Sequence, residues 1–109
     1  MTHYLFIESN DPLENRGVES YLDTALDLRR RNRPVTVFFV ENGAHAARAG
    51  AGPRQRQALL QAGATLKVDR FALSERGIPE GRLAPGVDVG DVEQIVDLLA
   101  DGDTKAVWH

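Results

Sequence analysis

The chain has 109 residues, 42% of them hydrophobic and 27% charged, which is enough apolar material for one buried core and too much for a disordered chain. Its net charge of −3 argues against a general nucleic-acid binder, which usually carries a basic excess. It contains no cysteine, which excludes disulfides, zinc–thiolate sites and thiol chemistry. Because it has neither a long apolar run nor a signal-peptide pattern, we expect a single cytoplasmic domain over residues 1–109, away from membranes.

Five short apolar runs predict the strands of a sheet. The strongest covers Val35 to Val40 (VTVFFV), which is β-branched and aromatic throughout. Continuous rather than alternating apolarity is typical of a central parallel strand that is covered on both faces. The other predicted strands are Tyr4–Glu8, Thr65–Val68, Val87–Val89 and Lys105–Trp108.

The segment after the first strand predicts a long helix. Asp11, Pro12 and Glu14 have the order of a helix start, with an acceptor at the cap and proline in the first turn. A run of arginines before Pro34 suits the negative end of a helix dipole. The apolar residues between these points recur at helical spacing: Val18, Leu22, Ala25 and Leu26.

Further helices are predicted between the later strands. After a turn at residues 41–43, these segments are Ala44–Ala49, Arg54–Ala62 with Gly63 as its stop, and Phe71–Arg76 with Gly77 as its stop. A last helix begins at Asp91, with Gln94 completing a capping box. We expect its buried stripe to be formed by Val92, Ile95, Val96 and Leu99.

Strands that alternate with helices predict a three-layer α/β/α sandwich with a mostly parallel five-stranded sheet. In such a sheet, ligands bind beyond the carboxyl ends of the strands. The residues that follow the predicted strands there are Glu8, Ser9, Asn10, Glu41, Asn42, Gly43, Asp69, Arg70, Gly90 and Asp91.

Several segments together resemble the DsrE/DsrF-like family of small sulfur-relay proteins. They are YLFIES, VTVFFVENGA, LLQAGATLKV, the run from Val68 to Ile78 (VDRFALSERGI) and APGVDVGDVEQIVDLLADGD, in this order. The resemblance implies a DsrE/F-like, flavodoxin-like sandwich. It also implies a homo-oligomer, either a trimer or a hexamer, with scope for a protein partner.

The position of the family's cysteine is what separates this chain from the sulfur carriers that it resembles. In those proteins a cysteine ends the third strand, eight residues before the glycine of an Arg-Gly pair. Counting back from Gly77 of Arg76-Gly77 gives Asp69, and a second family cysteine would fall on Ala72. A carboxylate cannot hold a sulfane sulfur or undergo thiol exchange. The prediction is therefore a non-catalytic binding or partner subunit, without a cofactor, that cannot carry persulfide.

A second hypothesis is a small enzyme or ligand-binding module for an anionic or phosphorylated metabolite. The candidate ligand-binding residues are Asn10, Glu41, Asn42, Asp69 and Arg76. Asp69 is either a ligand partner or the cap of the following helix. Arg76 is either an anion ligand or a cation that stabilises a helix end.

Two further features have open interpretations. If their strands are neighbours, Glu8, Glu41 and Asp69 would crowd and serve acid–base chemistry or a hard metal ion, whereas otherwise each sits in its own turn. Trp108 either packs at a subunit interface or closes the edge of the core. The histidines are too scattered for a metal motif, so we expect no metal site.

Overall fold

The computed structural model describes residues 1–109 and contains a five-stranded sheet in the order β4-β3-β2-β1-β5. Every neighbouring pair of strands is parallel, which confirms the predicted α/β class. The strands are β1 (His3–Glu8), β2 (Val35–Phe39), β3 (Thr65–Asp69), β4 (Val87–Gly90) and β5 (Thr104–Trp108). The helices are α1 (Gly17–Arg30), α2 (Arg54–Gln61), α3 (Arg70–Glu75) and α4 (Val92–Ala100), with 3₁₀-helices η1 (Glu41–Ala47) and η2 (Glu80–Arg82).

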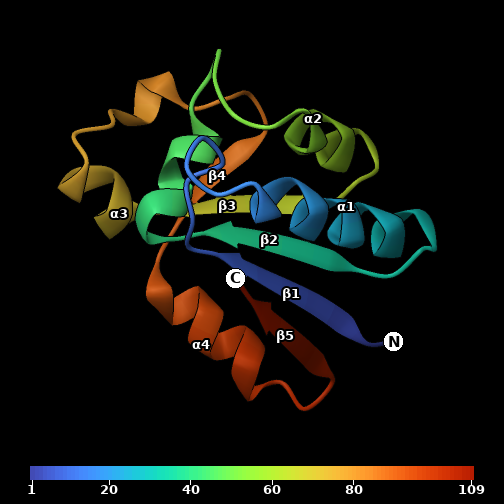
Figure 1. Ribbon diagram of the computed structural model, residues 1–109. Coiled ribbons are helices and arrows are strands. Elements are labelled where there is room, and N and C mark those ends of the chain that lie inside the picture. The colour runs from blue at the N-terminus through green and yellow to red at the C-terminus, as the bar shows by residue number, and fades with distance from the viewer.

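The two faces of the sheet are covered unequally. Figure 1 shows α1 and α2 on one side and α4 alone on the other. Because side chains alternate along a strand, Phe6 faces α1 while its neighbours Leu5 and Ile7 face α4. The core under α1 and α2 contains 20 buried residues, and the core under α4 contains five. None of the helices is long and apolar enough to cross a membrane.

The start of α1 differs from the prediction. The helix begins at Gly17 rather than directly after Asp11. The Asp11 carboxylate instead accepts from the backbone amide of Leu13 at 2.9 Å, while the Asn15 side chain accepts from Gly17 N at 2.8 Å. Short polar side chains compete with the helix by bonding to nearby amides, so Asp11 stabilises a turn instead of a cap. The predicted stripe of α1 is buried as expected.

The predicted turn at residues 41–43 and the helix after it form one element, the 3₁₀-helix η1. Glu41, its first residue, has a left-handed φ of 49°. Gly43 is required by the close approach of η1 to the end of β1, since a Cβ there would lie 2.1 Å from the carbonyl oxygen of Glu8. The start of η1 therefore packs directly against the end of β1.

Only part of the apolar stripe predicted for α4 is buried. Ile95 is 7% exposed, but Val92, Val96 and Leu99 are 53%, 56% and 51% exposed. The predicted burial of these three is wrong, because α4 rests on the sheet through the Ile95 side and no second helix packs against its flank. The predicted cap is confirmed: Asp91 and Gln94 form a capping box, in which the Gln94 side chain accepts from Asp91 N at 3.2 Å.

Candidate functional site

The carboxyl ends of the strands meet at the edge of the sheet where η1 and α3 lie, which is the edge toward which the arrows point in Figure 1. Turns that follow parallel strands gather polar groups at such an edge. The structure divides the predicted candidates there among three places: Asp69 beside α3, Asn42 with Arg76, and Asn10 with Glu8.

Asp69 ends β3 and caps α3. Its carboxylate accepts a hydrogen bond from Ala72 N at 3.1 Å, and the residue is only 8% exposed. It lines a hollow of about 410 Å³ together with Arg70, Ser74 and Asp91. The helix-cap interpretation therefore describes what the Asp69 side chain does, because one of its oxygens is held by the helix N-terminus.

Arg70 is electrically compensated within this hollow. Its guanidinium lies 3.2 Å from a carboxylate oxygen of Asp91 and 3.4 Å from one of Glu80. All three side chains are more than half exposed, so these ion pairs contribute little to stability. The hollow beside Asp69 thus carries paired charges rather than a free cation.

Two of the candidate ligand-binding residues, Asn42 and Arg76, lie in contact. Arg76 donates from Nε and Nη2 to the side-chain oxygen of Asn42, at 3.1 and 2.9 Å. It also donates from Nη1 to the carbonyl oxygen of Ala72 at 3.2 Å, which satisfies an end of α3. Arg76 is therefore a helix-end cation, and its guanidinium is fixed in place.

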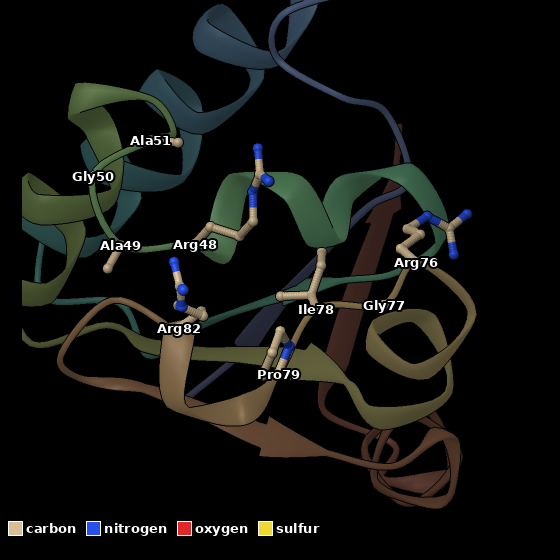
Figure 2. A pocket seen from close by; sticks show the side chains of 9 residues that line it. All are labelled: Arg48, Ala49, Gly50, Ala51, Arg76, Gly77, Ile78, Pro79 and Arg82. Carbon is tan, nitrogen blue, oxygen red and sulfur yellow. The ribbon is translucent and has the colours of Figure 1, made fainter.

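Arg76 also lines a larger cleft of about 570 Å³, which is shown in Figure 2. Arg48 and Arg82 line it too, with Ile78 and Pro79 between them and Arg76. Arg48 and Arg82 were not among the predicted site residues. They meet because residues 47–49 pair with residues 82–84, through Ala49 N to Arg82 O at 2.8 Å and Ala84 N to Ala47 O at 2.9 Å. No local sequence signal marks this long-range bridge.

Asn10 lies with Glu8 at the end of β1. Glu8 is fully buried, and its carboxylate accepts from Asn10 N at 3.0 Å and lies 2.7 Å from Nδ1 of His109. The contact with His109 arises because β5 lies beside β1, a placement that sequence spacing does not indicate. The carboxylate of Glu8 is thus occupied by Asn10 and His109.

Tyr21 of α1 covers this buried carboxylate. Its ring stacks on His109 with centroids 5.0 Å apart, and its hydroxyl donates to the carbonyl oxygens of Ile7, at 3.2 Å, and of Val107. Burial, and secondarily the negative charge of Glu8, raise the pKa of Tyr21 above its ordinary value. Tyr21 therefore stays protonated and ties α1 to the end of the edge strand β5.

Glu41 is exposed at the first residue of η1 and lines neither the cleft nor the hollow beside Asp69. No group of three or more histidine, aspartate or glutamate side chains is close enough to hold a metal ion. Glu8, Glu41 and Asp69 consequently do not form the crowded carboxylate cluster that neighbouring strands would allow. Of the three, Asp69 bonds only within its own turn, Glu8 bonds to both Asn10 and the distant His109, and Glu41 is exposed.

Comparisons with known proteins agree on the architecture. The crystal structure of the YchN protein from E. coli superposes with a TM-score of 0.90 at 18% identity, with all of both chains covered. The protein MTH1491 from Methanobacterium thermoautotrophicum, whose function is unknown, gives 0.86 at 17% identity, again over all of both chains. BT1422 from Bacteroides thetaiotaomicron gives 0.74 at 14% identity over 95% of this chain and 94% of that one. These define a class of parallel three-layer α/β proteins to which the fold belongs.

A sequence relative identifies the family within that class. No family model matches the chain. A protein of Pseudomonas aeruginosa PAO1, described as "Protein TusC homolog", is 33% identical over 105 residues, which cover 87% of this chain and 88% of the relative. The chain therefore belongs to the DsrE/DsrF-like family, which includes the TusC proteins, as its segments predicted.

Proposed function

We propose that this protein is a non-catalytic partner subunit related to the sulfur-relay proteins, one that assembles as a trimer or hexamer and carries no persulfide itself. The observation that carries the proposal is the occupant of the family's cysteine position. Asp69 and Ala72 stand where cysteines would be, and the chain has none elsewhere. Persulfide transfer requires a thiolate that attacks a sulfane sulfur, and no side chain here can supply one.

Both positions have structural roles instead. The Asp69 carboxylate caps α3, and Ala72, whose backbone amide it binds, is buried in the larger core. Loss of such a cap costs about 0.5–2 kcal/mol of stability. The local sequence is thus adapted to holding α3 in place, which supports a scaffold role rather than a role in transfer.

The uncovered side of α4 supports assembly. Val92, Val96 and Leu99 leave an apolar stripe more than half exposed, and the nearby edge strand β5 exposes Val107 and Trp108. Because Trp108 is 63% exposed, it does not close the core, which leaves the interface interpretation. Exposed apolar surface and an open strand edge are features that subunit contacts cover. The proposal includes a cytoplasmic location, where thiols of sulfur-carrying partners stay reduced.

The alternative, an enzyme that acts on an anionic metabolite through carboxylates, has less support. Asp69 is held by the helix cap, and Glu41 lies outside both hollows. The arginine that it requires is present, but no acid or base stands opposite it in the cleft.

Incubation with a cysteine desulfurase and cysteine, followed by intact mass measurement, tests the proposed inability to carry sulfur. We expect an unchanged mass, whereas a known persulfide carrier included in the same reaction should gain sulfur. A stable gain of a sulfur atom on this protein would overturn the proposal. The result does not depend on whether the protein is an oligomer, which a separate mass measurement addresses.

A further inference from the structure

The cleft in Figure 2 contains three positive charges and no negative one. Its titratable lining residues are Arg48, Arg76 and Arg82; the other six are Ala49, Gly50, Ala51, Gly77, Ile78 and Pro79. The ion pairs of the chain involve Met1, Arg31, Arg70 and His109, so none of the three arginines has a carboxylate within 4.0 Å. In a chain whose net charge is −3, such a local excess of cations requires an explanation.

Stabilisation of helix ends explains only one of the three. Arg76 bonds to the last turn of α3, as described above. Arg48 follows η1 and Arg82 ends η2, but neither guanidinium makes a hydrogen bond to a carbonyl group or to any other part of the chain. The Nε of Arg48 is buried without a hydrogen-bond partner in the chain, so the chain does not satisfy this guanidinium.

A fourth arginine holds the loop that carries Arg48. Nη1 of Arg56 donates to the carbonyl oxygens of Ala46, Arg48 and Ala51, at 2.7, 2.8 and 2.6 Å. Gly52 is needed for this wrapping, since a Cβ there would lie 2.5 Å from Arg56 Nη1. Arg56 is partly buried and appears in none of the ion pairs of the chain, so it adds positive charge beside the loop that carries Arg48. The wall of the cleft is thereby fixed before any ligand arrives, which lowers the entropic cost of binding.

We propose that this arginine cleft binds a small molecule through a phosphate or diphosphate group. Guanidinium groups bind phosphate through paired donors, and a multiply charged anion would balance positive charge that no carboxylate of the chain neutralises. The volume of about 570 Å³ lies within the range of small-molecule sites. Ile78 and Pro79 offer an apolar surface for the rest of an organic phosphate.

The cleft binds but does not catalyse. Its lining contains no carboxylate, histidine, hydroxyl or amine that could act as an acid, base or nucleophile. A phosphate ligand would therefore join the loop that carries Arg48 to the turn that carries Arg76. This inference does not rest on the proposed partner role, and each can fail without the other.

Calorimetric titration of the whole protein with inorganic pyrophosphate, at constant ionic strength, tests the proposal. The variants are Arg48→Gln, Arg82→Gln and the double substitution. Arg30→Gln is the matched control, because it removes the same charge from the far end of α1 at the opposite edge of the sheet. We expect each cleft substitution to weaken binding about ten-fold, the double variant to weaken it further, and the control to stay within about two-fold of the wild type.

A second readout uses the unmodified protein. Pyrophosphate should shift the NMR signals of the side-chain Nε–H groups of Arg48 and Arg82 and leave that of Arg30 unchanged. AMP in the same titration tests the apolar wall, and it should bind at least as tightly as inorganic phosphate. A short acidic peptide serves as the competing ligand.

Absence of saturable pyrophosphate binding at millimolar concentration would overturn the proposal. Equal weakening in the Arg30→Gln control would do the same, since it would indicate attraction to overall charge rather than to the cleft. If the acidic peptide binds at these arginines while pyrophosphate and AMP do not, the cleft receives a protein segment and the small-molecule assignment is wrong.

Discussion

The two faces of the sheet differ in how completely this chain covers them. Under α1 and α2, the side chains of the strands and helices form a core of 20 buried residues. Under α4, only five residues are buried, and three apolar side chains of the helix itself remain more than half exposed. The first face is completed within the chain, whereas the second has apolar surface that the chain leaves uncovered. We interpret the first as the face that stabilises the fold and the second as the face that serves assembly.

The largest effect is expected in the core of the first face. Leu22 of α1 is fully buried there, and Leu22→Ala should lower the free energy of unfolding by about 2–5 kcal/mol, because it removes apolar contacts and leaves a cavity. Urea denaturation followed by circular dichroism measures this. A loss below about 1 kcal/mol would mean that the larger core is not what holds the fold.

On the second face, a substitution should weaken assembly and leave the stability of the single chain nearly unchanged. Val96→Asp places a charge on the exposed flank of α4, where a single chain loses little buried apolar surface because Val96 is 56% exposed. We expect the helical signal to survive and the assembly to weaken, by about 2 kcal/mol or more per contact. Sedimentation velocity measures the change in mass, with Glu93→Asp on the same helix as the control. An unchanged mass for Val96→Asp would show that this flank is not a subunit contact.

Asp69→Cys replaces the helix cap of α3 with the thiol that the sulfur-carrying members of the family have at this position. Loss of the cap should reduce stability by about 1 kcal/mol, whereas Asp69→Asn should retain it because asparagine also caps helices. The new thiol lines the hollow beside α3, so it should react with an alkylating reagent, as mass spectrometry would show. A folded variant with an unreactive thiol would contradict the match between this position and the family's cysteine.

Tyr21→Phe probes the link from the first face to the edge strand. Loss of the hydroxyl bonds to Ile7 and Val107 should cost about 1 kcal/mol at neutral pH. The pKa of Tyr21 is raised in the folded state, so the unfolded chain releases this proton first, at its ordinary value near 10.

Because the unfolded chain loses the Tyr21 proton at a lower pH than the folded chain, high pH favours unfolding. The contribution of Tyr21 to stability is complete below about pH 10 and is lost as the pH rises above it. Thermal melts between about pH 9 and 11 should therefore show a steeper loss of stability in the wild type than in Tyr21→Phe. Parallel curves would indicate that Tyr21 titrates equally in both states.

Much of the fold can be predicted from local sequence. The apolar runs give all five strands, Gly63 and Gly77 stop their helices with positive φ angles of 91° and 62°, and the capping box of α4 is present. These features depend on neighbouring residues alone. The predicted start of α1 is wrong, because Asp11 and Asn15 each accept from the backbone amide two residues later, and these local turns delay the helix to Gly17.

The candidate site was only partly predictable, for a physical reason. The strand-end rule identifies Asn42, but Arg76 follows a helix, and their contact depends on how α3 packs beside η1. The meeting of Arg48 with Arg82 depends on a bridge between distant loops, and the contact of Glu8 with His109 depends on strand order. Likewise, apolar spacing in α4 predicts a stripe but does not tell whether this chain or another covers it.

Light scattering coupled to size-exclusion chromatography, run from low to high micromolar protein, tests most directly whether the second face belongs to an assembly. We predict the mass of a trimer or hexamer that persists across this range and falls to that of one chain in Val96→Asp. A wild-type protein that remains a monomer at high micromolar concentration would contradict the account.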